Sequence, residues 1–141
     1  MRTISSLSLA CVLSFSAPLA LALNSPAPNC LPPKCTVTVI VSGNSCAAGI
    51  AFSKDPIQNR IGAPVVIEWV LPSDSEWVFD GNRGIVVNMV DSNEITKEGN
   101  ATHKFAVRNK ATRRATYKYD INLVHPQTSA TCSLDPIIMT N

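Results

Sequence analysis

The side chains that could bind a transition metal or act as nucleophiles are few in this sequence. His103 and His125 are the two histidines, and Cys132 and Met139 follow His125 near the end of the chain. Two imidazoles, a thiolate and a weak thioether are the ligands of a blue-copper electron-transfer centre. A cysteine or serine beside an oriented base is the minimum for nucleophilic catalysis. These two chemistries decide which functions the sequence can support.

Neither histidine stands where a catalytic base is expected. His103 lies in "NATHKF", on the outward face of a predicted strand, and His125 precedes Pro126 at the end of another. The sequence holds no G-x-S-x-G elbow to present a nucleophilic serine. The acidic residues cluster between 68 and 98, mostly in polar, loop-like segments where carboxylates are solvated, so a glycosidase pair is not indicated. We therefore predict a protein that is not an enzyme.

Basic residues are concentrated between residues 104 and 118, and no acidic residue interrupts them. The candidate anion-binding patch within this run consists of Arg108, Lys110, Arg113 and Arg114. Such a run suits an anionic surface, and it also describes a strand-turn-strand face exposed to water, which is the interpretation that we favour. The turn "NKATRR" has no aromatic side chain to stack on bases, so we expect no nucleic-acid partner.

The N-terminal segment, residues 1–22, reads as a secretory signal peptide. Arg2 is the only charge in the first 33 residues, an apolar stretch runs from about Leu7 to Leu23, and Ala20-Leu21-Ala22 has the small-x-small pattern of a cleavage site. Serines and a proline interrupt this stretch, which is shorter than the roughly 20 apolar residues of a membrane span. No later stretch is long enough to span a membrane. We therefore expect an exported protein, periplasmic or extracellular, with no transmembrane span in the mature chain.

The rest of the chain is predicted to form a proline-rich lead-in, residues 23–34, and one domain, residues 35–141. Strands are expected where β-branched and aromatic residues alternate or run together between turn residues. These segments are 36–42, 47–53, 63–71, 84–90, 102–109, 115–124 and 136–139. Residues 91–101 are expected to form one helical turn or a long loop, and a polar loop is expected to carry Cys132. Short strands divided by Gly, Pro, Asn and Asp favour an antiparallel sandwich or barrel.

The four cysteines of the mature chain are expected to form disulfides. They are Cys30, Cys35, Cys46 and Cys132. An even number in an exported chain favours disulfides, and the spacing C-x4-C-x10-C without a nearby histidine is not a zinc pattern. A Cys35–Cys46 pair is disfavoured because the strand between them holds its ends about 20 Å apart. Two arrangements stay open: Cys30–Cys35 with Cys46–Cys132, and Cys30–Cys46 with Cys35–Cys132.

Three short segments resemble strands of the cupredoxins, the family of plastocyanin and azurin. "VVIEWVL" resembles the strand that reads apolar-x-apolar-x-Trp before the first copper ligand, "YKYD" resembles the Tyr-x-Tyr strand that leads to the ligand loop, and "DPIIMTN" resembles the closing strand. An immunoglobulin-like sandwich would have similar strands, but its Cys-Trp-Cys spacing is absent. The resemblance implies a Greek-key antiparallel β-sandwich, cupredoxin-like, over most of residues 35–141.

The resemblance does not extend to the copper ligands. The family's first histidine follows the Trp-containing strand, but no histidine occurs between residues 23 and 102. The family's cysteine comes soon after the Tyr-x-Tyr strand, where this chain has Ile121 and Asn122, and no histidine follows Cys132. Met139 lies inside the apolar run "PIIM", which favours core packing. We therefore expect no metal and no other cofactor.

The resemblance also implies a disulfide pairing and, through it, a function. In the cupredoxin arrangement the first strand and the Tyr-x-Tyr strand end near the same end of the sandwich. A Cys46–Cys132 bridge would tie them together where copper otherwise organises the loop, and Cys30–Cys35 would close the proline-rich segment. We predict an exported, non-enzymatic module without copper that binds an unknown protein or cell-surface partner or serves as a structural part. The alternative is an atypical copper-binding or electron-transfer protein.

Overall fold

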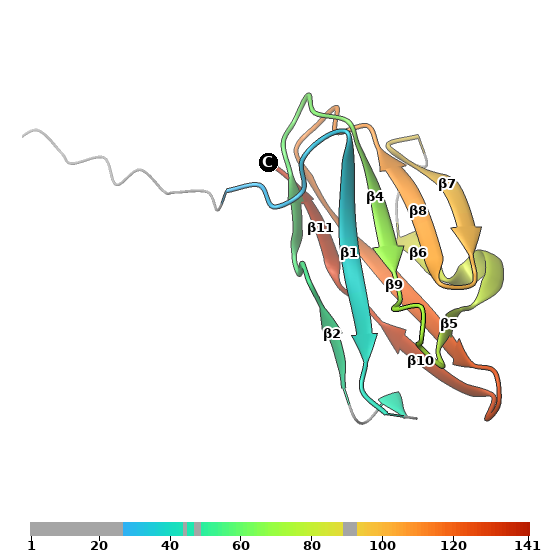
Figure 1. The fold of residues 1–141 in the computed structure, drawn as a ribbon. Helices are drawn as coiled ribbons and strands as arrows, with labels where there is room; N and C mark the ends of the chain where they lie inside the picture. The colour runs from blue at the N-terminus through green and yellow to red at the C-terminus, as the bar shows by residue number, and fades with distance from the viewer. Residues whose placement is uncertain (1–26, 44, 47–48, 89–92) are drawn as a thin grey trace, which may run out of the picture.

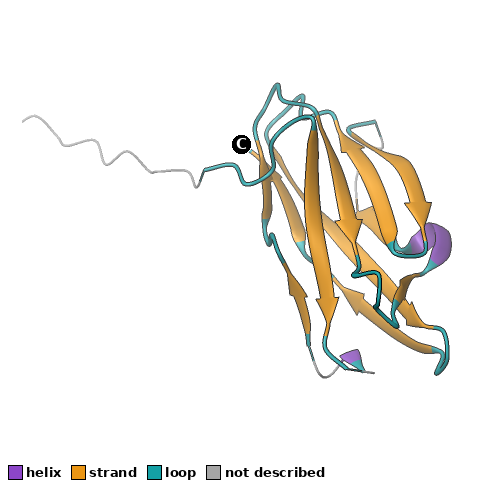
Figure 2. Cartoon of the chain, viewed as in Figure 1, coloured by secondary structure: helices purple, strands orange, loops and turns teal. Residues whose placement is uncertain are grey.

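The computed structural model describes residues 27–43, 45–46, 49–88 and 93–141. The expected signal peptide, residues 1–22, and the first part of the predicted lead-in lie outside the described residues. Strands account for nearly all regular structure in the described part, and they form two sheets packed face to face (Figures 1 and 2). None of the helices found there is long and apolar enough to cross a bilayer.

The first sheet has the order β2-β1-β4-β8-β7. Its strands are β1 (Lys34–Val41), β2 (Ile50–Phe52), β4 (Val65–Val70), β7 (Ile95–Ala101) and β8 (Lys104–Asn109). The β1–β4 pair is parallel, and the other pairs are antiparallel. Strand β4 is central, and its residues on both faces are buried or half-buried, which fits its nearly continuous apolar sequence.

The second sheet is built around one long strand, β9 (Ala115–His125). Strands β10 (Ala130–Leu134) and β11 (Ile137–Thr140) follow one edge of β9 in a continuous antiparallel register. Strands β5 (Val78–Phe79) and β6 (Ile85–Asn88), joined through the 3-10 helix η2 (Gly81–Arg83), follow its other edge. Strand β3 (Ile57–Asn59) pairs with β11 in parallel. The predicted all-β sandwich is therefore confirmed, and both of its sheets are mixed.

The core lies between the sheets because alternate residues of the main strands point inward. Cys35, Val37 and Val39 of β1 are buried, and the odd-numbered residues of β9 from Tyr117 to His125 are buried in the same way. Across the core, the Trp69 indole Nε1 donates a hydrogen bond of 3.2 Å to the Tyr119 hydroxyl. Burial raises the pKa of this hydroxyl far above its ordinary value.

Four strands occupy segments in which the sequence predicts none. Residues 91–101 were expected as a helical turn or loop, but Ile95–Ala101 is strand β7. The polar loop expected to carry Cys132 is mostly strand β10, and β3 and β5 are too short for a sequence pattern. Strand β7 is an edge strand with few buried residues, so its sequence lacks the apolar alternation that marks a core strand.

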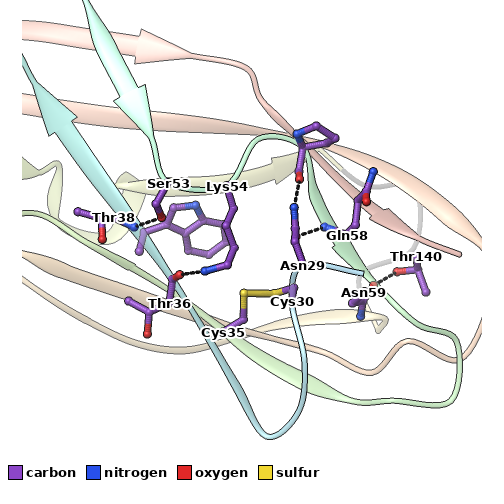
Figure 3. The surroundings of a disulfide bond; sticks show 12 residues. Asn29, Cys30, Cys35, Thr36, Thr38, Ser53, Lys54, Gln58, Asn59 and Thr140 are labelled. Carbon is purple, nitrogen blue, oxygen red and sulfur yellow. Dashed lines mark hydrogen bonds between the residues drawn. A yellow bond between two sulfur atoms is a disulfide. The ribbon is translucent and has the colours of Figure 1, made fainter. Parts of the chain in front are cut away.

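The proline-rich lead-in is held against the sandwich at Asn29 and Cys30. Cys30 N donates to Gln58 O at 2.9 Å, and the Asn29 side chain accepts from Gln58 N and donates to Pro56 O. Cys30 is bonded to Cys35, and both residues are buried in the core (Figure 3). This bridge was expected to close a segment at the edge of the fold, and it is instead part of the hydrophobic core.

Candidate functional site

The Cys46–Cys132 disulfide joins the two sheets at one end of the sandwich, called here the disulfide end. Cys46 follows β1, and Cys132 lies in β10 opposite Leu123 of β9. Their Cα atoms are 5.6 Å apart, and Cys132 is buried. Strands β1 and β9 both finish at this end (Figure 1). A sulfur bonded in this way offers no thiolate to a metal ion.

Met139, the candidate thioether, lies far from Cys132. It belongs to β11 and pairs with Thr116 at the beginning of β9, whereas Cys132 pairs with Leu123 near the end of β9. At about 3.3 Å per residue along the continuous register, the two sulfur-bearing residues are on the order of 20 Å apart. Met139 therefore cannot share a ligand sphere with Cys132.

His125 is buried at the disulfide end and contacts Trp77 and Glu76. The residue is 2% exposed, and its Nε2 lies 3.3 Å from Glu76 Oε2. The Trp77 ring meets the imidazole edge-on, with ring centroids 5.3 Å apart, and Trp77 Nε1 donates to Gly43 O. The His125 Nδ1 has no hydrogen-bond partner. Sequence reasoning did not identify Trp77 or Glu76 as neighbours of His125, because the loop that carries them has no recognisable motif.

His103 lies near the same loop but does not join His125. His103 lies in the turn between strands β7 and β8. Its Nε2 is 3.2 Å from the carbonyl oxygen of Ser75, which belongs to the loop after β4. Across the described residues, no three His, Cys, Asp or Glu side chains come together as a metal site. The two imidazoles are thus held by separate neighbours, one by a carboxylate and one by a carbonyl group.

A shallow hollow of about 260 Å³ opens beside this loop. Ile40, Val41 and Trp77 supply apolar walls, and Asp74 and Glu76 supply carboxylates. Ile40 is 51% exposed, so the hollow is open to solvent on the β1 side. Its chemistry suits a weak contact with a cationic or amphipathic group, and the Ser75 hydroxyl in its wall accepts a hydrogen bond from Trp77 N.

Two of the acidic residues between 68 and 98, Glu68 and Glu94, are occupied in separate structural contacts. Glu68 pairs with Lys34 at 2.7 Å and with Lys104 at 2.8 Å on the outer face of the first sheet. Burial acts to raise the pKa of the Glu68 carboxyl, but hydrogen bonds from Lys104 and Lys34 outweigh it and hold the pKa below its ordinary value. Glu94 is buried and accepts hydrogen bonds from the Thr112 amide and hydroxyl groups.

The predicted anion-binding patch does not form a single cluster. Arg108 lies in β8 and forms an ion pair with Glu98 of the neighbouring strand β7. Lys110, Arg113 and Arg114 are exposed on the loop between β8 and β9. That loop lies at the opposite end of the sandwich from Cys132, beside the loop of residues 60–64.

The structure adds residues to this second end, called here the basic end and made up of Leu31, Arg60, Ile61, Lys110 and Arg114. All five are exposed. Gly62 N donates to Ala111 O at 2.8 Å, which fixes the two loops side by side. Arg60, Ile61 and Leu31 are distant from the basic run in sequence, so only the tertiary structure reveals them as its neighbours.

In comparisons with known proteins, no family model matches this chain and no curated protein matches its sequence. Its own residues and their geometry are therefore the basis for assigning a function. The two disulfides indicate folding in an oxidising, exported environment.

Proposed function

We propose that this protein is a non-enzymatic binding module that works in the periplasm or the extracellular medium. Its framework is cupredoxin-like but does not use copper, and its partner is a protein or a component of a cell surface. The observation that carries this proposal is the Cys46–Cys132 disulfide. It ties together the two strand ends at which the cupredoxin resemblance would place the metal, and it takes the candidate thiolate out of metal chemistry.

Other contacts support the same function. The imidazoles of His103 and His125 are held by different neighbours, and Met139 is distant from both Cys132 and the disulfide end. The buried acids Glu68 and Glu94 hold strands and loops in place. The parallel β1–β4 pair and the common end of β1 and β9 are compatible with a cupredoxin-like arrangement.

Copper titration tests this proposal directly. Protein purified with both disulfides intact is titrated with Cu(II) and followed by calorimetry and visible absorption. We expect no intense copper–thiolate absorption and only the weak binding that a partly exposed imidazole such as that of His103 gives. An intense band that disappears in the Cys132→Ser variant would overturn the proposal.

A copper-binding role is the second candidate, and the environment of His125 is the observation that favours it. The Nδ1 atom is buried without a partner, and a carboxylate lies at Nε2. These are two donor types that Cu(II) accepts. One tight equivalent of Cu(II) that is lost in His125→Ala and kept in His103→Ala would favour this second function over the first.

A further inference from the structure

The basic end combines exposed apolar and cationic side chains on three adjoining loops. Gly62 N donates to Ala111 O at 2.8 Å, which joins the loop of residues 60–64 to the loop of residues 110–114. At the start of the neighbouring strand β4, Val66 N donates to Pro33 O at 3.0 Å, which holds the segment after Leu31 beside them. Figure 1 shows the three loops together at the end opposite the β9–β10 turn. The end therefore forms one surface, although its residues come from distant parts of the chain.

Two large apolar side chains of this end project into solvent. Leu31 is 59% exposed and Ile61 is 39% exposed. Only two other large apolar residues are comparably exposed in the described part, Ile40 on β1 and Val86 on β6. Single exposed apolar residues need no explanation, but two on adjoining loops among cations are the composition of an interfacial membrane anchor.

The cations at this end are not neutralised by neighbours. No acidic side chain among the described residues forms an ion pair with Arg60, Lys110 or Arg114. Arg113, on the same loop, makes an interaction of its own and is not one of these three cations. Elsewhere the basic side chains of Lys34, Lys104 and Arg108 are paired with glutamates, so the basic end differs from these positions in leaving its three cations open to an anionic ligand.

The loop of residues 110–114, between β8 and β9, is held in a fixed conformation. Ala111 is fully buried with a φ of 53°, and its amide donates to Asn109 Oδ1 at 2.9 Å. The Glu94 carboxylate accepts from both the amide and the hydroxyl of Thr112, and Lys110 N donates to Glu94 O at 3.0 Å. A surface that is already ordered binds without the entropic cost of ordering a flexible loop.

We propose that the basic end docks on the surface of an anionic membrane. Leu31 and Ile61 enter the interfacial region, while Arg60, Lys110 and Arg114 contact lipid phosphates. Guanidinium groups suit phosphate because they donate two parallel hydrogen bonds, and their apolar stems lie along the interface. This inference rests on the exported location in the proposed function and is independent of copper binding. It names an anionic membrane as the cell-surface partner.

A membrane explains both features of the surface, whereas a soluble anion explains only one. Free phosphate or a polyanion would use the cations and leave Leu31 and Ile61 in water. An apolar protein partner would use the two apolar residues and gain nothing from three unpaired cations. The charge complementarity and the apolar pair together favour lipid headgroups over either of these occupants.

Vesicle sedimentation with a matched pair of charge variants tests the electrostatic part. The probes are phosphatidylcholine vesicles with and without phosphatidylglycerol. We expect binding only to the anionic vesicles and about a 25-fold loss in Arg60→Gln/Lys110→Gln, because each cation near an anionic surface is worth about fivefold, or about 1 kcal/mol. The control Arg83→Gln/Lys118→Gln removes one Arg and one Lys that are exposed elsewhere, and it should bind within about threefold of the wild type.

A second matched pair tests the apolar part. Leu31→Ser/Ile61→Ser should lose at least about fivefold in vesicle binding, because partial insertion of two aliphatic side chains is removed. Ile40→Ser/Val86→Ser removes two comparably exposed aliphatic residues away from the basic end and should bind as the wild type does. We expect the wild type to stay partly bound at about 0.15 M salt, where screening reduces the charge contribution but not the apolar one.

Three outcomes would overturn the inference. They are equal binding to neutral and anionic vesicles, an equal loss in the test and control charge pairs, and an unchanged affinity in Leu31→Ser/Ile61→Ser. An unchanged vesicle affinity of Leu31→Ser/Ile61→Ser, together with complete displacement of the protein from vesicles by heparin, would assign the cations to a soluble polyanion. If one variant fails to fold by circular dichroism, the other pair decides. The copper titration tests the proposed function separately, so the two failures can be told apart.

Discussion

At the scale of single residues, Glu68 is a charged side chain whose role is to hold neighbouring strands together. It sits in the central strand β4 and is buried on the outer face of the first sheet, beneath the ammonium groups of Lys34 and Lys104. The two lysines come from the neighbouring strands β1 and β8. This charge therefore links three strands, and removing it leaves two ammonium groups without their partner.

Glu68→Gln should lower stability at neutral pH by on the order of 1 kcal/mol, because both lysines are half exposed and water screens the pair. The folded pKa of Glu68 lies below its ordinary value, so its contribution is present above about pH 4.5 and is lost as pH falls through the folded pKa. The difference between variant and wild type should therefore shrink toward pH 3. Urea denaturation at several pH values measures this.

Glu98→Gln is the matched control for that experiment. Glu98 pairs with Arg108 at a more exposed position on edge strand β7, so its loss should change stability by less than about 0.5 kcal/mol. A pH-independent difference for Glu68→Gln would mean that Glu68 acts through packing and not through its charge.

At the scale of elements, the junction β5–η2–β6 is tightly constrained at Gly84. Gly84 follows η2, and a Cβ built on it would lie 2.7 Å from Phe79 Cβ and 3.1 Å from Phe105 Cδ2. The Phe79 and Phe105 rings pack edge-on, with centroids 6.2 Å apart. Gly84 O also accepts the amide of Asn122 in β9, so the backbone cannot move away.

Gly84→Ala should therefore destabilise the protein by about 1–3 kcal/mol, the usual cost of overpacking a close contact. Gly99→Ala is the control, since nothing lies within 4 Å of a Cβ at that glycine of β7. That variant should be neutral or stabilised by less than about 1 kcal/mol. Thermal denaturation of the two variants gives the comparison, and a similar effect at both positions would contradict the steric account.

The sequence predicted the elements whose burial follows a simple period. The burial of strand β9 alternates over its full length, and β4 is apolar except for Glu68, so both were expected close to their observed bounds. Edge strands β7 and β10 were not expected, because each buries a single residue, Ile95 or Cys132, and so shows no repeated apolar alternation. The basic end was only partly predicted for a different reason: Arg60 and Ile61 are distant from Lys110 in sequence and approach it only through tertiary contacts.

At the scale of the whole molecule, the two disulfides stabilise the fold in different ways. Cys46–Cys132 spans a sequence separation of 86 and joins the sheets, whereas Cys30–Cys35 spans a separation of 5. Loop entropy alone assigns them about 4.6 and about 2 kcal/mol respectively. The short bridge has an additional contribution, however, because both of its cysteines are buried in the core and anchor the segment that pairs with Gln58.

The last prediction separates these contributions by their effect on the unfolded chain. Cys46→Ala/Cys132→Ala should cost about 4 kcal/mol and raise the urea m-value, because an unfolded chain freed from a long loop exposes more surface. Cys30→Ala/Cys35→Ala should cost about as much, from about 2 kcal/mol of loop entropy plus lost core packing, with an unchanged m-value.

Urea titrations of both double variants, with the intact protein as reference, measure the two quantities together. A loss below about 1 kcal/mol for Cys30→Ala/Cys35→Ala would mean that this bridge closes a peripheral segment, as its sequence position alone suggests. A raised m-value for that variant would instead mean that the lead-in retains structure in the unfolded chain only while the bridge is closed. Either result would separate the lead-in from the core in which the structure places it.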